Sequence, residues 1–116
     1  MIRQSNENGN IIVSETVYSD IVGAAAANCF GVKGMVARSM RDGLYHLLRK
    51  ESRSKGVRVQ FNEDGTISID LHVMVDNGVN LGAVGDAIIE EVRYVVTNTT
   101  GTPVQDVNVY IDAVVE

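Results

Sequence analysis

The chain of 116 residues has one cysteine, one proline and no tryptophan, and only 5% of its residues are aromatic. A single cysteine, Cys29, excludes an intrachain disulfide and a metal site built from cysteines, so we expect a small buried side chain near a helix end. The longest apolar run, around residues 24–27, is far shorter than the ~20 residues that span a bilayer. The polar start of the chain also lacks the apolar core of a signal peptide, so we expect a cytoplasmic protein.

The remaining composition is that of an ordinary globular protein, with 45% apolar and 22% charged residues. At this length one domain with its own core is expected. Residues 1–8 are polar and without periodicity, which predicts a flexible lead-in. Residues 9–116 show no second composition shift and no internal repeat, so we assign them to a single domain.

The net charge of −5 conceals a strong separation of charge along the chain. Residues 33–58 contain eight basic and two acidic side chains, a net charge of +6, whereas residues 62–116 contain ten acidic side chains and one arginine, a net charge of −9. Such a layout is compatible with a solvated helix, with an anionic partner, or with copies that meet basic segment to acidic half. The candidate interaction residues of this basic segment are Lys33, Arg38, Arg41, Arg49, Lys50, Arg53, Lys55 and Arg58.

Hydrophobic periodicity in the first half predicts a short strand at residues 11–13 and a helix from Ser14 to about Cys29. The apolar stripe of that helix comprises Val17, Ile21 and Ala24 or Ala25. Residues 31–35, with two glycines, predict a tight connection with positive φ. A second, strongly basic helix is expected over residues 38–52, although Gly43 disfavours it.

The second half has clearer patterns. Residues 57–61 and 67–75 alternate between apolar and polar side chains around a glycine turn at residues 62–65, which predicts an antiparallel hairpin with one covered face. A helix from Asn80 to about residue 98 is closed by Gly101, and a last strand follows over residues 104–113. The predicted buried stripe of this helix is Leu81, Val84, Ile88, Val92 and Val95.

The resulting order, β-α-(α)-β-β-α-β, predicts an α+β fold. Two main helices cover one face of a four-stranded, largely antiparallel sheet in a two-layer, ferredoxin-like arrangement, with the basic helix as an addition.

Little in the sequence indicates catalysis or a cofactor. His72 and Asp70 fall on the exposed face of one predicted strand, and Asp112 or Asn108 on the last strand could complete a three-ligand metal site, but polar residues are simply expected on a solvated sheet face. The glycine-rich stretch 78–85 lacks the spacing and the lysine of a phosphate loop. We therefore predict no catalytic residues, no metal and no cofactor.

A nucleic-acid partner is also not expected, although RNA-recognition modules share the predicted strand order. Those modules stack bases on aromatic side chains of the open sheet face. Here that face offers His72, Met74 and Tyr110, and the isoelectric point near 4.9 opposes a phosphate partner.

Several segments together resemble the alkaline-shock and general-stress proteins of Gram-positive bacterial envelopes. They are Gly9-Asn10-Ile11-Ile12-Val13-Ser14, Gly31-Val32-Lys33-Gly34-Met35, Gly56-Val57-Arg58-Val59, Ile69-Asp70-Leu71-His72-Val73 and Val107-Asn108-Val109-Tyr110-Ile111. The resemblance covers residues 9–115.

This resemblance implies a non-enzymatic cytoplasmic scaffold or interaction protein that supports cell-envelope homeostasis under stress. It implies self-association, with docking on an integral-membrane partner in some members. The alternative it implies is an accessory subunit of a dihydroxyacetone-kinase-like protein of fatty-acid activation. The family has no known catalytic residues to transfer, and the absence of long charged tails here leaves the membrane tether of larger relatives open.

Overall fold

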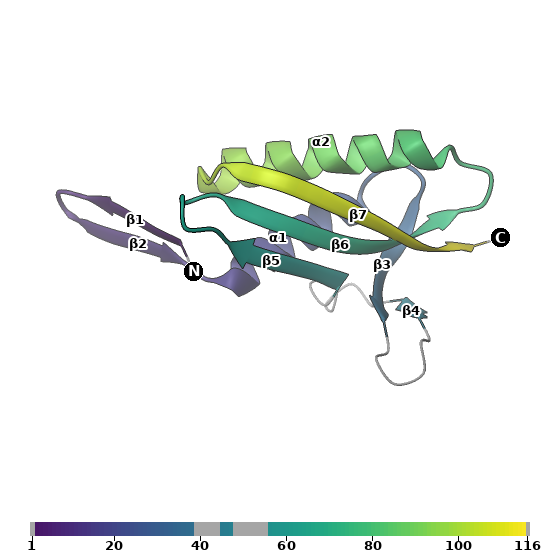
Figure 1. The fold of residues 1–116 in the computed structure, drawn as a ribbon, viewed down its shortest axis with the longest axis horizontal. Helices are drawn as coiled ribbons and strands as arrows, with labels where there is room; N and C mark the ends of the chain where they lie inside the picture. The colour runs from purple at the N-terminus through teal and green to yellow at the C-terminus, as the bar shows by residue number, and fades with distance from the viewer. Residues whose placement is uncertain (1, 39–44, 48–55, 116) are drawn as a thin grey trace.

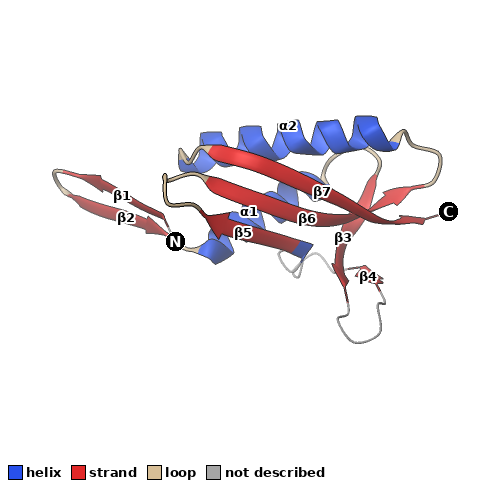
Figure 2. Ribbon diagram, in the orientation of Figure 1, coloured by secondary structure: helices blue, strands red, loops and turns tan. Residues whose placement is uncertain are grey.

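The computed structural model describes residues 2–38, 45–47 and 56–115 (Figures 1 and 2). Two helices and seven strands follow one another along these residues: β1 (Ile2–Asn6), β2 (Gly9–Val13), α1 (Glu15–Ala27), β3 (Val32–Arg38), β4 (Tyr45–Leu47), β5 (Val57–Phe61), β6 (Ile67–Asp76), α2 (Leu81–Thr100) and β7 (Val104–Val115).

Strand β6 is the centre of the main sheet. On one side it pairs with β7 in parallel along its whole length, and on the other it pairs antiparallel with β5 and then with β3. The predicted alternation is confirmed, because Ile67, Ile69, Leu71, Val73 and Val75 are all fully buried. Both helices contribute to the core that these side chains form. The predicted α+β fold, with a largely antiparallel sheet and two helices on one face, is therefore confirmed.

Gly56 allows β5 to begin where β3 leaves β6. A Cβ atom at this position would lie 3.0 Å from the Val36 carbonyl oxygen and 3.3 Å from the His72 carbonyl oxygen. A Cβ atom here would press on the backbones of β3 and β6, so glycine lets the three strands converge without displacing one another.

Helix α2 begins and ends as its sequence predicts. The side chain of Asn80 accepts a hydrogen bond from the Ala83 amide at 2.9 Å, and Gly101 ends the helix in the left-handed conformation with φ of 74°. Its buried residues are Val84, Ile88, Val92 and Val96. The prediction that Leu81 is buried is wrong, because this side chain is 47% exposed.

Helix α1 buries a face shifted by one residue from the predicted stripe. Tyr18 and Val22 are fully buried, whereas Val17 is 43% exposed. The reason is the hydroxyl of Tyr18, which forms a buried hydrogen bond of 2.7 Å with the Thr102 hydroxyl and directs the aromatic ring inward. The ring also packs edge to face against Phe61, with centroids 5.7 Å apart. Ser14 makes no side-chain capping bond.

Two predictions for the middle of the chain are wrong. Gly31 does have positive φ, 86°, but residues 32–38 form strand β3 instead of a connection. Residues 45–47, expected within the basic helix, form strand β4. The reason is strand pairing: β3 lies antiparallel to β6, which is distant in sequence, and to β4, which is close in sequence, and these ladders override the local helical spacing. The rest of the expected helix, residues 39–44 and 48–55, lies outside the described residues.

The start of the chain forms a hairpin and not an irregular lead-in. Strands β1 and β2 pair over five residues each, and the Asn6 side chain accepts hydrogen bonds from the amides of Asn8 and Gly9 in the turn. The predicted strand at residues 11–13 therefore exists, but it pairs with β1 instead of joining the main sheet. The hairpin projects from one end of the body (Figure 1). At its base, Gln4 donates a hydrogen bond to the Thr100 carbonyl.

Candidate interaction surfaces

The open face of the sheet carries a histidine held by two neighbours from β7. The Nδ1 atom of His72 lies 2.8 Å from Oδ2 of Asp112, and its ring stacks on Tyr110 with centroids 4.7 Å apart. Asp112 is the extra residue of a bulge, since Ile111 pairs with Val73 and Ala113 with Met74. This arrangement fixes the imidazole, and Asp112 is the only hydrogen-bond partner of its ring among the described residues.

The possible three-ligand metal site is not assembled. Asp70 accepts a hydrogen bond of 2.9 Å from the Asn108 amide, while Asp112 bonds to His72. Within residues 2–38, 45–47 and 56–115, no three histidine, cysteine, aspartate or glutamate side chains gather in a way that could hold a metal ion.

The structure places only part of the predicted basic segment. Lys33 is exposed on β3, Arg38 is the last residue of β3, and Arg58 is exposed on β5. Arg41, Arg49, Lys50, Arg53 and Lys55 lie outside the described residues.

The outer edge of β7 is a second candidate surface. In the part of the chain that the structure describes, β7 pairs with β6 alone, so alternate backbone N–H and C=O groups of a 12-residue strand point away from the sheet. Arg93 engages only the start of this edge, where its guanidinium donates to the carbonyls of Val104 and Gln105 at 2.5 and 3.4 Å. Tyr110 is 46% exposed farther along.

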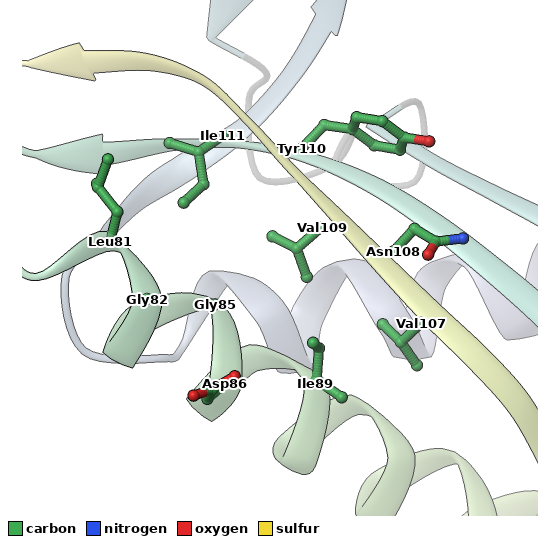
Figure 3. A pocket seen from close by; sticks show the side chains of 10 residues that line it. All are labelled: Leu81, Gly82, Gly85, Asp86, Ile89, Val107, Asn108, Val109, Tyr110 and Ile111. Atoms are coloured by element: carbon green, nitrogen blue, oxygen red, sulfur yellow. The ribbon is translucent and has the colours of Figure 1, made fainter.

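Beside this edge runs a groove of about 470 Å³ between β7 and the first half of α2 (Figure 3). Figure 3 shows Val107 and Val109 pointing towards α2, whereas Tyr110 points to the opposite side of the strand. The helix wall of the groove has little height because Gly82 and Gly85 lie there. The residues that line the groove are Leu81, Gly82, Gly85, Asp86, Ile89, Val107, Asn108, Val109, Tyr110 and Ile111.

A separate hollow of about 460 Å³ lies near the end of α1, beside Phe30. Phe30 is 89% exposed and is the most exposed of the large apolar side chains in the described residues. This hollow is bounded by the loop at residues 77–80 and by Ala83, Val84 and Ala87 of α2.

Sequence reasoning missed the groove. The predicted buried stripe includes Leu81, and the glycine-rich stretch 78–85 is considered only as a phosphate loop, which its spacing excludes. The available signal was the spacing of Gly82 and Gly85: two glycines three residues apart remove side chains from one flank of a helix. Whether that flank is covered depends on the position of β7, which local sequence does not specify.

Comparison with known proteins shows which family has this sequence. Residues 3–116 match the model of the ASP23 family, described as having a cell envelope-related function. The chain belongs to this alkaline-shock family. The resemblance seen in the sequence is thereby confirmed.

Two bacterial relatives cover nearly the whole chain. The uncharacterised protein YloU of Bacillus subtilis is 36% identical over 107 residues, which are 91% of this chain and 88% of YloU. An uncharacterised protein of Streptococcus pyogenes is 34% identical over 111 residues, which are 95% of this chain and 91% of that protein.

Solved structures of the MamM CTD share the fold. One variant, with a histidine replaced by alanine, aligns with a TM-score of 0.51 at 17% identity and covers 86% of this alkaline-shock family chain and 98% of its own. A double variant of the same domain aligns with a TM-score of 0.50, also at 17% identity. Neither α1 nor α2 is both long and apolar enough to cross a membrane, and no other helix lies within the described residues.

Proposed function

We propose that this protein is a non-enzymatic cytoplasmic scaffold that supports cell-envelope homeostasis under stress, by association of its copies or by docking on a membrane-protein partner. The observation that carries the proposal is the open edge of β7 with its apolar groove. Natural proteins usually shorten, cover or charge such an edge, because it is a template for pairing with another chain. A long edge beside an uncovered apolar groove therefore supports a role in protein association.

Charge separation supports the same proposal. The segment of residues 33–58 carries a net charge of +6 and residues 62–116 a net charge of −9. Opposite potentials on one chain favour encounter between copies, and this attraction is screened by salt.

Sedimentation velocity at ~50 mM and ~500 mM salt tests self-association, since the screening length shortens about threefold over this range. We expect large species at low salt that dissociate at high salt. Replacing Arg49, Lys50 and Arg53 together with glutamate should abolish association while circular dichroism shows an unchanged fold. Replacing the same residues with glutamine should weaken it to an intermediate degree.

A monomer at both salt concentrations would contradict self-association. The protein would then need a different anionic partner, and co-purification with the dihydroxyacetone-kinase-like protein or with an integral-membrane protein would decide between the accessory-subunit and docking alternatives.

A further inference from the structure

We propose that the β7 edge and its groove receive the β1–β2 hairpin of a second copy, with β2 adding to the sheet beside β7. This inference rests on the proposed self-association: attraction between the basic segment and the acidic half brings copies together, and the hairpin and the β7 edge are the surfaces that then meet.

The hairpin has the character of an element that lacks a partner. Residues 5–12 are all exposed, although Ile11 and Ile12 within them are large apolar side chains, exposed by 56% and 52%. An isolated two-stranded ribbon is at best marginally stable in water. Covering both isoleucines would therefore stabilise the hairpin as well as the assembly.

Strand β2 is apolar on both faces, and the β7 edge offers a surface on both faces. Consecutive residues of a strand point to opposite sides, so Ile11 and Ile12 cannot be covered by one flat surface. A strand added to β7 would direct one of them into the groove beneath α2 and the other towards Tyr110 on the open face. Each isoleucine thus has a counterpart at the same edge.

Charge favours Ile12 as the isoleucine that enters the groove. Within the two paired strands of the hairpin, Arg3 is the only charged residue, and it lies directly opposite Ile12, so both side chains share one face. The rim of the groove carries Asp86, and Glu90 follows one turn later on α2. The open face of this edge also carries carboxylates, but Asp70 and Asp112 there already bond to Asn108 and His72. Placing Ile12 in the groove brings Arg3 to the face of Asp86 and Glu90, and Ile11 then lies beside Tyr110.

The two surfaces occupy different parts of the molecule, since the hairpin projects from one end and the groove lies beside the first half of α2 (Figures 1 and 3). Each copy can therefore offer its hairpin to one neighbour and its groove to another. Such a contact builds a ring or an open chain of copies when each hairpin goes to a new neighbour, and a twofold dimer when two copies exchange hairpins.

Disulfide trapping between two differently tagged proteins tests the contact directly. Both carry Cys29→Ser; one also carries Ile11→Cys and the other Tyr110→Cys. Neighbouring strands bring Cβ atoms within disulfide reach, so mild oxidation should yield a covalent heterodimer. The matched control pairs Ile11→Cys with Tyr94→Cys on the exposed side of α2, where Tyr94 is 66% exposed. Equal trapping in both mixtures, or none in the first, overturns the proposal.

Affinities from sedimentation of single variants give a second test. Ile12→Ser should weaken association about 30-fold, because an apolar side chain leaves the groove. Phe30→Ser, at a still more exposed apolar site away from the groove, should leave the affinity unchanged. Arg3→Glu and Asp86→Arg should each weaken association severalfold, and the double variant should restore it.

Failure of this inference can be separated from failure of the proposed function. If the wild-type protein associates and the Ile12→Ser variant associates equally well, the proposed hairpin contact is wrong, and the copies associate through another surface. If the wild-type protein is monomeric at every salt and protein concentration, self-association itself is wrong.

Discussion

The two halves of α2 meet β7 in opposite ways. In the second half, Val92 and Val96 are fully buried, and Arg93 bonds to the first carbonyls of the strand. In the first half, Leu81 is 47% exposed and a groove remains beside Gly82 and Gly85. Both halves have apolar side chains, so low hydrophobicity does not explain the opening. Small residues on the helix and the open edge of the strand do, which is why we assign the interaction surface to the first half.

The largest expected effect comes from breaking the packed centre of α2. Ile88 is fully buried in the core. Ile88→Ala should lower the free energy of unfolding by about 2–4 kcal/mol, because it removes buried methyl groups and leaves a cavity. Urea denaturation measures this loss. Leu81→Ala on the same helix should cost less than about 1 kcal/mol, since Leu81 is half exposed. Equal losses in the two variants would show that the groove is not open in solution.

A smaller loss of stability is expected on removing the hydrogen bonds that join α2 to β7. Arg93→Gln removes charge-assisted hydrogen bonds to the carbonyls of Val104 and Gln105. We expect the free energy of unfolding to fall by about 1 kcal/mol. The amide hydrogens of residues 104–106 should exchange faster than in the wild-type protein, while those of β6 keep their rates. Unchanged stability and unchanged exchange rates would mean that Arg93 does not hold the second half of α2 against the start of β7.

Gly85 separates stability from association. A Cβ atom at this position meets no atom within 4 Å, so alanine fits without strain. Gly85→Ala should therefore stabilise the fold by up to about 1 kcal/mol through helix propensity. It should also weaken association, because the added methyl group narrows the groove. Stronger association together with higher stability would contradict the assignment of this surface.

The smallest effect concerns the flank of α2 that faces α1, opposite the groove. Burial, and in addition the carboxylate of Glu91, raise the pKa of the Cys29 thiol. A raised pKa lowers the thiolate fraction at pH 8, so alkylation should be slower than for a free cysteine and should accelerate as the pH rises. Glu91→Gln should speed the reaction by only about twofold, since burial is the larger cause. A large acceleration of alkylation would show that the Glu91 carboxylate, and not burial, is the main cause of the raised pKa of Cys29.

The parts of the fold predicted correctly from the sequence are those set by local chemistry. The alternation of β6, the Asn80 cap and the Gly101 end of α2 depend on neighbouring residues and appear as expected. Strand β3 was missed because its ladder with β6 joins residues distant in sequence, and β4 was missed because it is defined by pairing with β3. The hairpin was missed because β1 has little apolar character of its own and is defined by pairing with β2.

The candidate site was less predictable for the same reason. His72 and Asp112 were expected on one face and do meet, with the bulge at Asp112 placing its carboxylate beside the imidazole. The partner of Asp70 depends on the register between β6 and β7. The groove depends on which edge of the sheet β7 occupies, and no spacing within α2 encodes that position.

Hydrogen exchange as a function of protein concentration tests the account most directly. If copies meet at the β7 edge, amides of residues 107–113 should gain protection as the protein associates, while the amides in the last turn of α2 stay unchanged. Association without any added protection in β7 would contradict the claim that this edge is where the copies meet.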